Sequence, residues 1–151
     1  MADHDEEWHR EIAKQQFNRC WDLIELAERS PDDEVDMLLA AMASRWHWGQ
    51  IGGAEQIATG DWQIAHVASL LGHGEMARTF AGRNLAAAEA LGFTGWQLAS
   101  AHEGMARSCA ATGDADARAR HLAAAEAELE TEDDPESVQI VTEQLASVPP
   151  V

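Results

Sequence analysis

The sequence has little of what disulfide-bonded, metal-binding and membrane-spanning proteins need. Its two cysteines, Cys20 and Cys109, lie far apart, and neither belongs to a CxxC motif or has a histidine at ligand spacing. No apolar run reaches the roughly 18 residues that a membrane-spanning helix requires. We therefore expect two buried thiols, no metal or other cofactor, and no membrane partner.

Basic residues are also scarce, because 10 lysines and arginines stand against 27 aspartates and glutamates, which gives a formal net charge of -17. Such a surface repels the phosphates of nucleic acids and of anionic lipids, so we expect no nucleic-acid partner. The first residues are acidic, unlike the start of a signal peptide, which predicts a cytoplasmic protein. Residues 37–113 hold only 5 acids and 4 bases, so the middle of the chain is nearly neutral.

Alternation of apolar and polar residues at period two is nearly absent, whereas spacings of three and four residues recur along the chain. The pattern predicts an all-α fold of about seven helices, stacked as antiparallel hairpins in a single domain over residues 1–151 with a frayed start at 1–7. The expected helices span about 8–28, 31–51, 54–71, 75–91, 95–112, 115–129 and 135–148.

Capping chemistry and apolar stripes support these helices. Ser30 and Asp134, each followed by proline, are expected N-caps, and Thr94 with Gln97 fits a capping box. The apolar positions of the second helix predict the face that it buries in the core. They are Val35, Leu38, Leu39, Met42 and Trp46.

A short motif recurs in the middle of the chain. Trp62-Gln63-Ile64-Ala65 returns further on as Trp96-Gln97-Leu98-Ala99, and we expect each copy to open the first helix of a hairpin. The interval between the two copies is that of a tetratricopeptide repeat, about 34 residues. The segments that match the pattern further on are 105–114 and 122–125.

With these motifs, residues 62–129 resemble tetratricopeptide-like helical repeats. Residues 43–48 and 60–72 are also similar to a group of small bacterial proteins with tetratricopeptide-like folds and no established activity. The resemblance implies a tetratricopeptide-like α-solenoid with a C-terminal capping helix. It brings no catalytic residues.

The sequence also lacks catalytic motifs such as HExxH, a phosphate-binding glycine loop or GxSxG. Glu6 and His9 form a Glu-x-x-His spacing, but di-iron bundles need that motif on two helices. His47, His66 and His102 would suit a three-histidine metal site only if packing brought them together, since no two lie four residues apart. We therefore expect no catalytic residues and no metal site.

The near-neutral middle of the chain holds the candidate site. If Trp46 is in the core, Trp48 points away from it, toward a groove between the second, third and fifth helices. Arg45 is the only cation between residues 29 and 78 and suits a carboxylate or phosphate, unless it pairs with Asp61 or Glu55. The expected groove residues are Arg45, His47, Trp48, Trp62, Gln63, His66 and His102.

These observations favour a non-enzymatic scaffold that holds a protein or peptide partner in the groove. A homodimer is a further expectation, because the first two helices carry more large apolar residues than one packing stripe needs. The alternative is an enzyme or small-molecule-binding protein with a pocket around Arg45, His47, Trp62 and His66. An open groove would favour the scaffold, and a closed cavity with converging polar groups would favour the alternative.

Overall fold

The chain folds into seven helices joined by short turns, in a computed structural model that describes residues 5–151. The helices are α1 (Glu6–Ile24), α2 (Pro31–Ile51), α3 (Ala54–Leu70), α4 (Gly74–Ala90), α5 (Trp96–Thr112), α6 (Ala115–Leu129) and α7 (Pro135–Ala146). No strand is present in this described range, so the all-α prediction is confirmed. Within the same range, no helix combines the length and apolar character needed to cross a bilayer.

Residues 5–7 are not frayed, although fraying was expected for residues 1–7. Glu6 and Glu7 belong to α1, and the Asp5 carboxylate caps that helix by accepting the Trp8 N–H at 2.9 Å. Residues 1–4 lie outside the described part of the chain.

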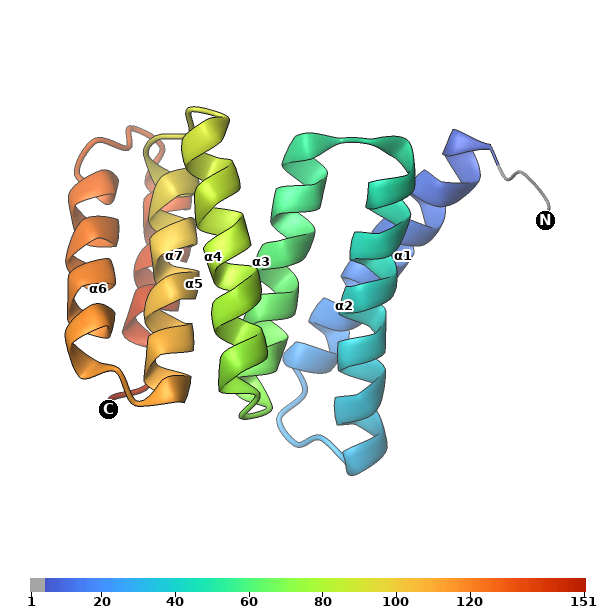
Figure 1. The fold of residues 1–151 in the computed structure, drawn as a ribbon, viewed down its shortest axis with the longest axis horizontal. Helices are drawn as coiled ribbons and strands as arrows, with labels where there is room; N and C mark the ends of the chain where they lie inside the picture. The colour runs from blue at the N-terminus through green and yellow to red at the C-terminus, as the bar shows by residue number, and fades with distance from the viewer. Residues whose placement is uncertain (1–4) are drawn as a thin grey trace.

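Consecutive helices pack in pairs along the molecule. Figure 1 shows the pairs α1–α2, α3–α4 and α5–α6 following one another along the long axis. α3 also packs on α5, and α5 packs on α7, so the first helices of successive pairs share one layer. This layer carries the groove described below.

The helix pairs recur at a longer interval than the Trp-Gln motif. α3 begins at Ala54 and α5 at Trp96, while α4 begins at Gly74 and α6 at Ala115. Both intervals exceed the motif's interval, which is that of a tetratricopeptide repeat. Trp96 opens α5 as expected, but Trp62 lies in the middle of α3, so the expectation that both motif copies open a helix is wrong for Trp62. The motif therefore does not mark equivalent positions of the two hairpins.

The main core lies between α1, α2 and α3. Its fully packed side chains are Cys20, Leu23, Met37, Ala40, Ala41, Ile64 and Val67. A smaller core joins α5, α6 and α7 through Ala99, Ala125 and Val141. Many of these residues are alanines, and small side chains at helix contacts let the backbones approach closely.

α2 buries a different face from the predicted one. Met37, Ala40, Ala41 and Ser44 are buried, whereas Val35, Leu39 and Trp46 are exposed by 56%, 59% and 56%. The prediction that Trp46 lies in the core is therefore wrong. The physical reason is the close approach of α1, since Ser44 Oγ donates a hydrogen bond to the Ala13 carbonyl at 2.8 Å, and such a contact needs small residues.

The helix ends are partly as predicted. Ser30 and Asp33 cap α2 reciprocally, and Asp134 caps α7, as expected. Thr94 does not cap α5, because carboxylates from the other end of the hairpin do so: Glu128 accepts the Gly95 N–H at 3.1 Å and Glu132 the Trp96 N–H at 2.9 Å. α1 ends at Ile24 and not near residue 28.

Candidate binding groove

A groove with aromatic walls lies over the layer of α1, α3, α5 and α7. Its first cavity has a volume of about 320 Å³ and is half open to solvent. The large apolar side chains that line it are Phe17, Trp21, Trp62, Phe93, Trp96, Ile140 and Val141. With Asn84 and Ala88 of α4, five helices thus contribute walls to one cavity.

A second cavity of about 320 Å³ adjoins the first. It is lined by Lys14, Phe17, Asn18, Trp48, Glu55, Gln56 and Thr59. Phe17, Glu55 and Thr59 line both cavities, which makes them parts of one groove. The groove therefore extends from Trp48 near the end of α2 to the side chains of α7.

Trp62 is held in a fixed position on the wall of the first cavity. Its indole N–H donates a hydrogen bond to the Ser100 carbonyl at 3.1 Å. Its ring stacks on Trp21, with centroids 5.8 Å apart, and on His66, with centroids 5.1 Å apart. A Cβ at Gly104 would lie 3.3 Å from the Trp62 ring, so this glycine gives the indole room on the α5 side.

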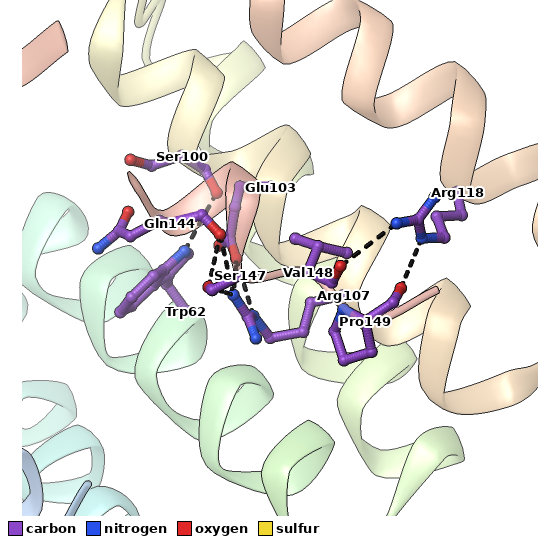
Figure 2. A network of polar contacts seen from close by, with 9 residues as sticks. All are labelled: Trp62, Ser100, Glu103, Arg107, Arg118, Gln144, Ser147, Val148 and Pro149. Carbon is purple, nitrogen blue, oxygen red and sulfur yellow. Dashed lines mark hydrogen bonds and ion pairs between the residues drawn. The ribbon is translucent and has the colours of Figure 1, made fainter. Parts of the chain in front are cut away.

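A buried ion pair lies beside Trp62 and ties α7 to α5. Glu103 and Arg107 of α5 are both buried, and Arg107 Nε donates to Glu103 Oε1 at 2.8 Å. Arg107 also donates to the Gln144 carbonyl at 3.1 Å and to Ser147 Oγ at 2.7 Å (Figure 2). Burial raises the pKa of Glu103, and the Arg107 charge opposes that rise. The pair thus holds the helix that forms one wall of the groove.

Arg118 of α6 adds a second polar tie to the C-terminal segment. It donates to the Pro149 carbonyl at 2.7 Å and to the Val148 carbonyl at 3.3 Å (Figure 2). Within α7 itself only Val141 is fully buried. The C-terminal segment is therefore attached by these polar ties as well as by the packing of Val141 and Leu145.

Two of the seven predicted groove residues, Trp48 and Trp62, line these cavities. His47 lies instead in an aromatic cluster, with its Nδ1 2.9 Å from that of His9 and its ring against Trp8 and Trp46. The other four lie behind the groove or apart from it. They are Arg45, Gln63, His66 and His102.

Gln63 and His66 are buried behind the groove wall. Gln63 donates to the Phe17 carbonyl at 3.2 Å, and within residues 5–151 neither its Oε1 nor His66 Nδ1 has a hydrogen-bond partner. Burial first, and the Arg107 charge second, lower the pKa of His66 to about 3, so its ring is neutral near neutral pH.

The remaining histidine contacts give no metal cluster. His102 on α5 faces His121 on α6, with the two Nδ1 atoms 3.0 Å apart, and burial lowers the pKa of both rings. Within residues 5–151, no group of three or more His, Cys, Asp and Glu side chains is placed to hold a metal ion. The groove itself offers aromatic stacking, apolar contact and a few hydrogen-bonding groups.

Arg45 pairs with Asp61, which is one of the two acidic partners that the sequence offered as an alternative to a ligand. Its Nε donates to Asp61 Oδ1 at 2.8 Å, and the other carboxylate oxygen accepts from Arg83 at 3.3 Å. The Asp61 carboxylate is buried, and a Cβ at Gly60 would lie 3.0 Å from the Arg45 side chain. Arg45 therefore joins α2 to α3 through a buried acid.

Arg45→Ala is expected to lower the free energy of unfolding by about 1–3 kcal/mol, because Asp61 loses its shorter charged hydrogen bond. Chemical denaturation followed by circular dichroism measures the loss. The matched control is Arg83→Ala, which removes the longer bond of a more exposed side chain and is expected to cost less than about 1 kcal/mol. Equal stabilities of Arg45→Ala and the parent protein would contradict the structural role.

Sequence reasoning missed most of the groove lining. Phe17 and Trp21 were recognisable only as large residues beside the main stripe of the first helix, and Ile140 of the last helix carried no special pattern. Trp96 was marked by the repeated motif. Which of these side chains meet depends on how α1, α3, α5 and α7 pack.

No protein-family model, no curated protein and no solved structure matches the chain.

Proposed function

We propose that the chain is a non-enzymatic binding module whose groove holds an apolar segment of a protein or peptide partner. The observation that carries the proposal is the pair of adjoining cavities, walled by aromatic side chains from α1, α3 and α5 and by Ile140 of α7. Aromatic rings offer large contact areas at low conformational cost, and they are common anchors of protein interfaces. An open groove also suits a chain segment that continues beyond it at both ends.

The proposal includes a solenoid arrangement of the hairpins, of the tetratricopeptide-like kind. It is supported by the row of helix pairs and by the shared layer of their first helices, with α7 covering the last one. The interval from α3 to α5 is longer than a tetratricopeptide repeat and nearer to the roughly 40–47 residues of HEAT and armadillo repeats. In such stacks the shared layer is a usual place for partner binding.

An enzyme or small-molecule receptor centred on Arg45, His47, Trp62 and His66 has less support. Of these four, only Trp62 lines the groove, since Arg45 pairs with Asp61 and His47 contacts His9. The groove is also half open and mainly apolar, whereas catalysis by acid or base needs titratable groups at the reacting atoms.

A second candidate partner is another copy of this chain. The exposed stripe of Val35, Leu39 and Trp46 on α2 supports it, since a helix rarely leaves such large apolar groups in water. This surface is separate from the groove, so self-association and peptide binding are compatible.

Blocking the groove tests the proposed function. Thr59 is exposed and lines both cavities, so Thr59→Trp fills the space where they meet. Peptides selected against the parent protein from a display library of random heptapeptides are expected to be rich in apolar residues. We expect these peptides to bind Thr59→Trp at least about tenfold more weakly, as measured by calorimetry. The added indole fills the space that a side chain of the bound peptide would occupy.

Thr79→Trp is the matched control. Thr59 and Thr79 each donate to the carbonyl four residues before them, Glu55 and Glu75, at 3.0 Å, and Thr79 is likewise exposed but lies on α4 outside both cavities. This variant is expected to bind the selected peptides as the parent does. Peptides that bind Thr59→Trp with unchanged affinity would refute the groove as their site.

A further inference from the structure

The charge of the groove is concentrated at one point. Among residues 5–151, Glu55 is the only charged residue that lines the first cavity, and it also lines the second. Its side chain is exposed, and one carboxylate oxygen accepts a hydrogen bond from Gln97 at 3.3 Å. None of the ion pairs within residues 5–151 involves Glu55. A negative charge therefore stands free of any fixed cation where the two cavities meet.

Tryptophan rings share the first cavity with this carboxylate. Trp62 and Trp96 line the first cavity together with Glu55, and Trp96 is exposed by 43%. The faces of indole rings attract cations, and a planar guanidinium also stacks on them. The net charge of -17 adds a general attraction for positive ligands.

The second cavity differs in charge from the first. Lys14 lines it on the side of α1, beside Trp48, and does not line the first cavity. A positive group on a ligand is therefore favoured in the first cavity, against Glu55, and less so near Lys14. A bound peptide with a positive group at one end is therefore expected to prefer one of its two possible orientations in the groove.

We propose that the partner segment carries an arginine flanked by apolar side chains, with its guanidinium against Glu55 and the tryptophan faces and an apolar neighbour in the first cavity. This inference rests on the proposed function, since it names the chemistry of the segment that the groove holds. Arginine fits better than lysine because it pairs with a carboxylate through a planar fork and stacks on indole at the same time.

Three short peptides that differ in one side chain test the inference. They are N-acetylated, C-amidated Leu-Arg-Leu, Leu-Gln-Leu and Leu-Glu-Leu, titrated at fixed salt while the indole N–H signals of the six tryptophans are followed by NMR. The arginine peptide is expected to bind about five- to tenfold more tightly than the glutamate peptide. This ratio is what one exposed ion pair and one cation–π contact give together. The signals of Trp62 and Trp96 should shift most.

Glu55→Gln should reduce this preference to about twofold or less, because the paired charge is gone. Glu126→Gln, which removes one exposed acid of α6 outside the groove, changes the net charge equally and should keep the preference. A preference that stays at about five- to tenfold in Glu55→Gln overturns the inference, since Glu55 would then contribute nothing to it.

The failures of the two proposals are distinguishable. If all three peptides shift the Trp62 and Trp96 signals with equal affinity, the arginine inference is overturned and the apolar groove stands. If no peptide shifts these signals, while the fold is intact by circular dichroism, both the inference and the proposed function are overturned.

Discussion

Arg107→Ala is expected to lower the free energy of unfolding by about 3–5 kcal/mol, which is the usual cost of breaking a buried ion pair by removing one partner. Glu103 is fully buried, and in the described part of the chain its Oε2 has no hydrogen-bond partner. Without Arg107, the carboxylate would have to stay charged in an apolar site or take up a proton. Either outcome destabilises the folded state and leaves the unfolded chain unaffected.

The same variant is expected to loosen α7. Arg107 donates to the Gln144 carbonyl and to Ser147 Oγ, so both contacts are lost with its side chain (Figure 2). Hydrogen exchange should therefore speed up within residues 138–147 more than elsewhere. Because Ile140 and Gln144 line the first cavity, the groove should lose one wall before the fold is lost.

Two further variants separate the charge from the contacts. Glu103→Leu combined with Arg107→Met leaves no buried charge, and the double variant should recover most of the stability that Arg107→Ala loses. Arg118→Ala removes only the bonds to Val148 and Pro149 and is expected to cost about 1 kcal/mol. Urea denaturation measures all three, and a loss below about 1 kcal/mol for Arg107→Ala would disprove the proposed role of the pair.

The fold was predictable where local chemistry decides it. Helical spacing, Ser30 and Asp134 with the prolines after them, and the glycines between helices mark elements that the structure confirms. The buried face of α2 was not predictable in this way, because hydrophobicity favours Val35, Leu39 and Trp46, whereas close packing against α1 selects Ala40, Ala41 and Ser44. The distance between two helix backbones depends on both helices, so the apolar pattern of one helix does not predict it.

The groove was predictable only in part for a related reason. Trp48 and Trp62 stood out because tryptophan is rare, and both line a cavity. Their expected places on the helices were wrong, since Trp46 is exposed and Trp62 does not open α3. Arg45 stood out as the only cation between residues 29 and 78, and His47 lies two residues after it. Partners far away in the sequence, Asp61 and His9, hold both side chains elsewhere. The two partners lie 16 and 38 residues away in the sequence. Such contacts depend on how the helices pack, and no local sequence pattern marks them.

Stability is expected to fall as the pH drops below about 6.5, because His66 is buried as a neutral ring. Its pKa is about 3 in the folded protein, because the ring is buried and stands near the Arg107 charge, against about 6.5 in an unfolded chain. Above pH 6.5 both states hold a neutral ring, so His66 adds no pH dependence. As pH falls from 6.5 toward 3, only the unfolded chain takes up the proton, and the folded state loses stability. The loss amounts to about 2 kcal/mol at pH 5 and about 4 kcal/mol near pH 3.

Other buried groups change the total profile, so the parent protein alone does not isolate His66. The lowered pKa values of His47, His102 and His121 act in the same direction. The raised pKa of Glu103 acts in the opposite direction, since the folded state then takes up its proton before the unfolded chain does. A comparison between variants cancels these common contributions.

His66→Leu removes the titrating ring and keeps an apolar side chain against Trp62. The stability difference between the parent and His66→Leu is expected to shift by about 2 kcal/mol in favour of the variant between pH 7.5 and pH 5, measured by urea denaturation at each pH. Val67→Ala, at the neighbouring and fully buried position, has no titrating group and should cost the same at both pH values. A shift of equal size in both variants would mean that low pH loosens this part of α3 as a whole. A shift in His66→Leu alone assigns the effect to the proton that the buried ring excludes, and it would show that the wall behind Trp62 stays closed to water in the folded protein.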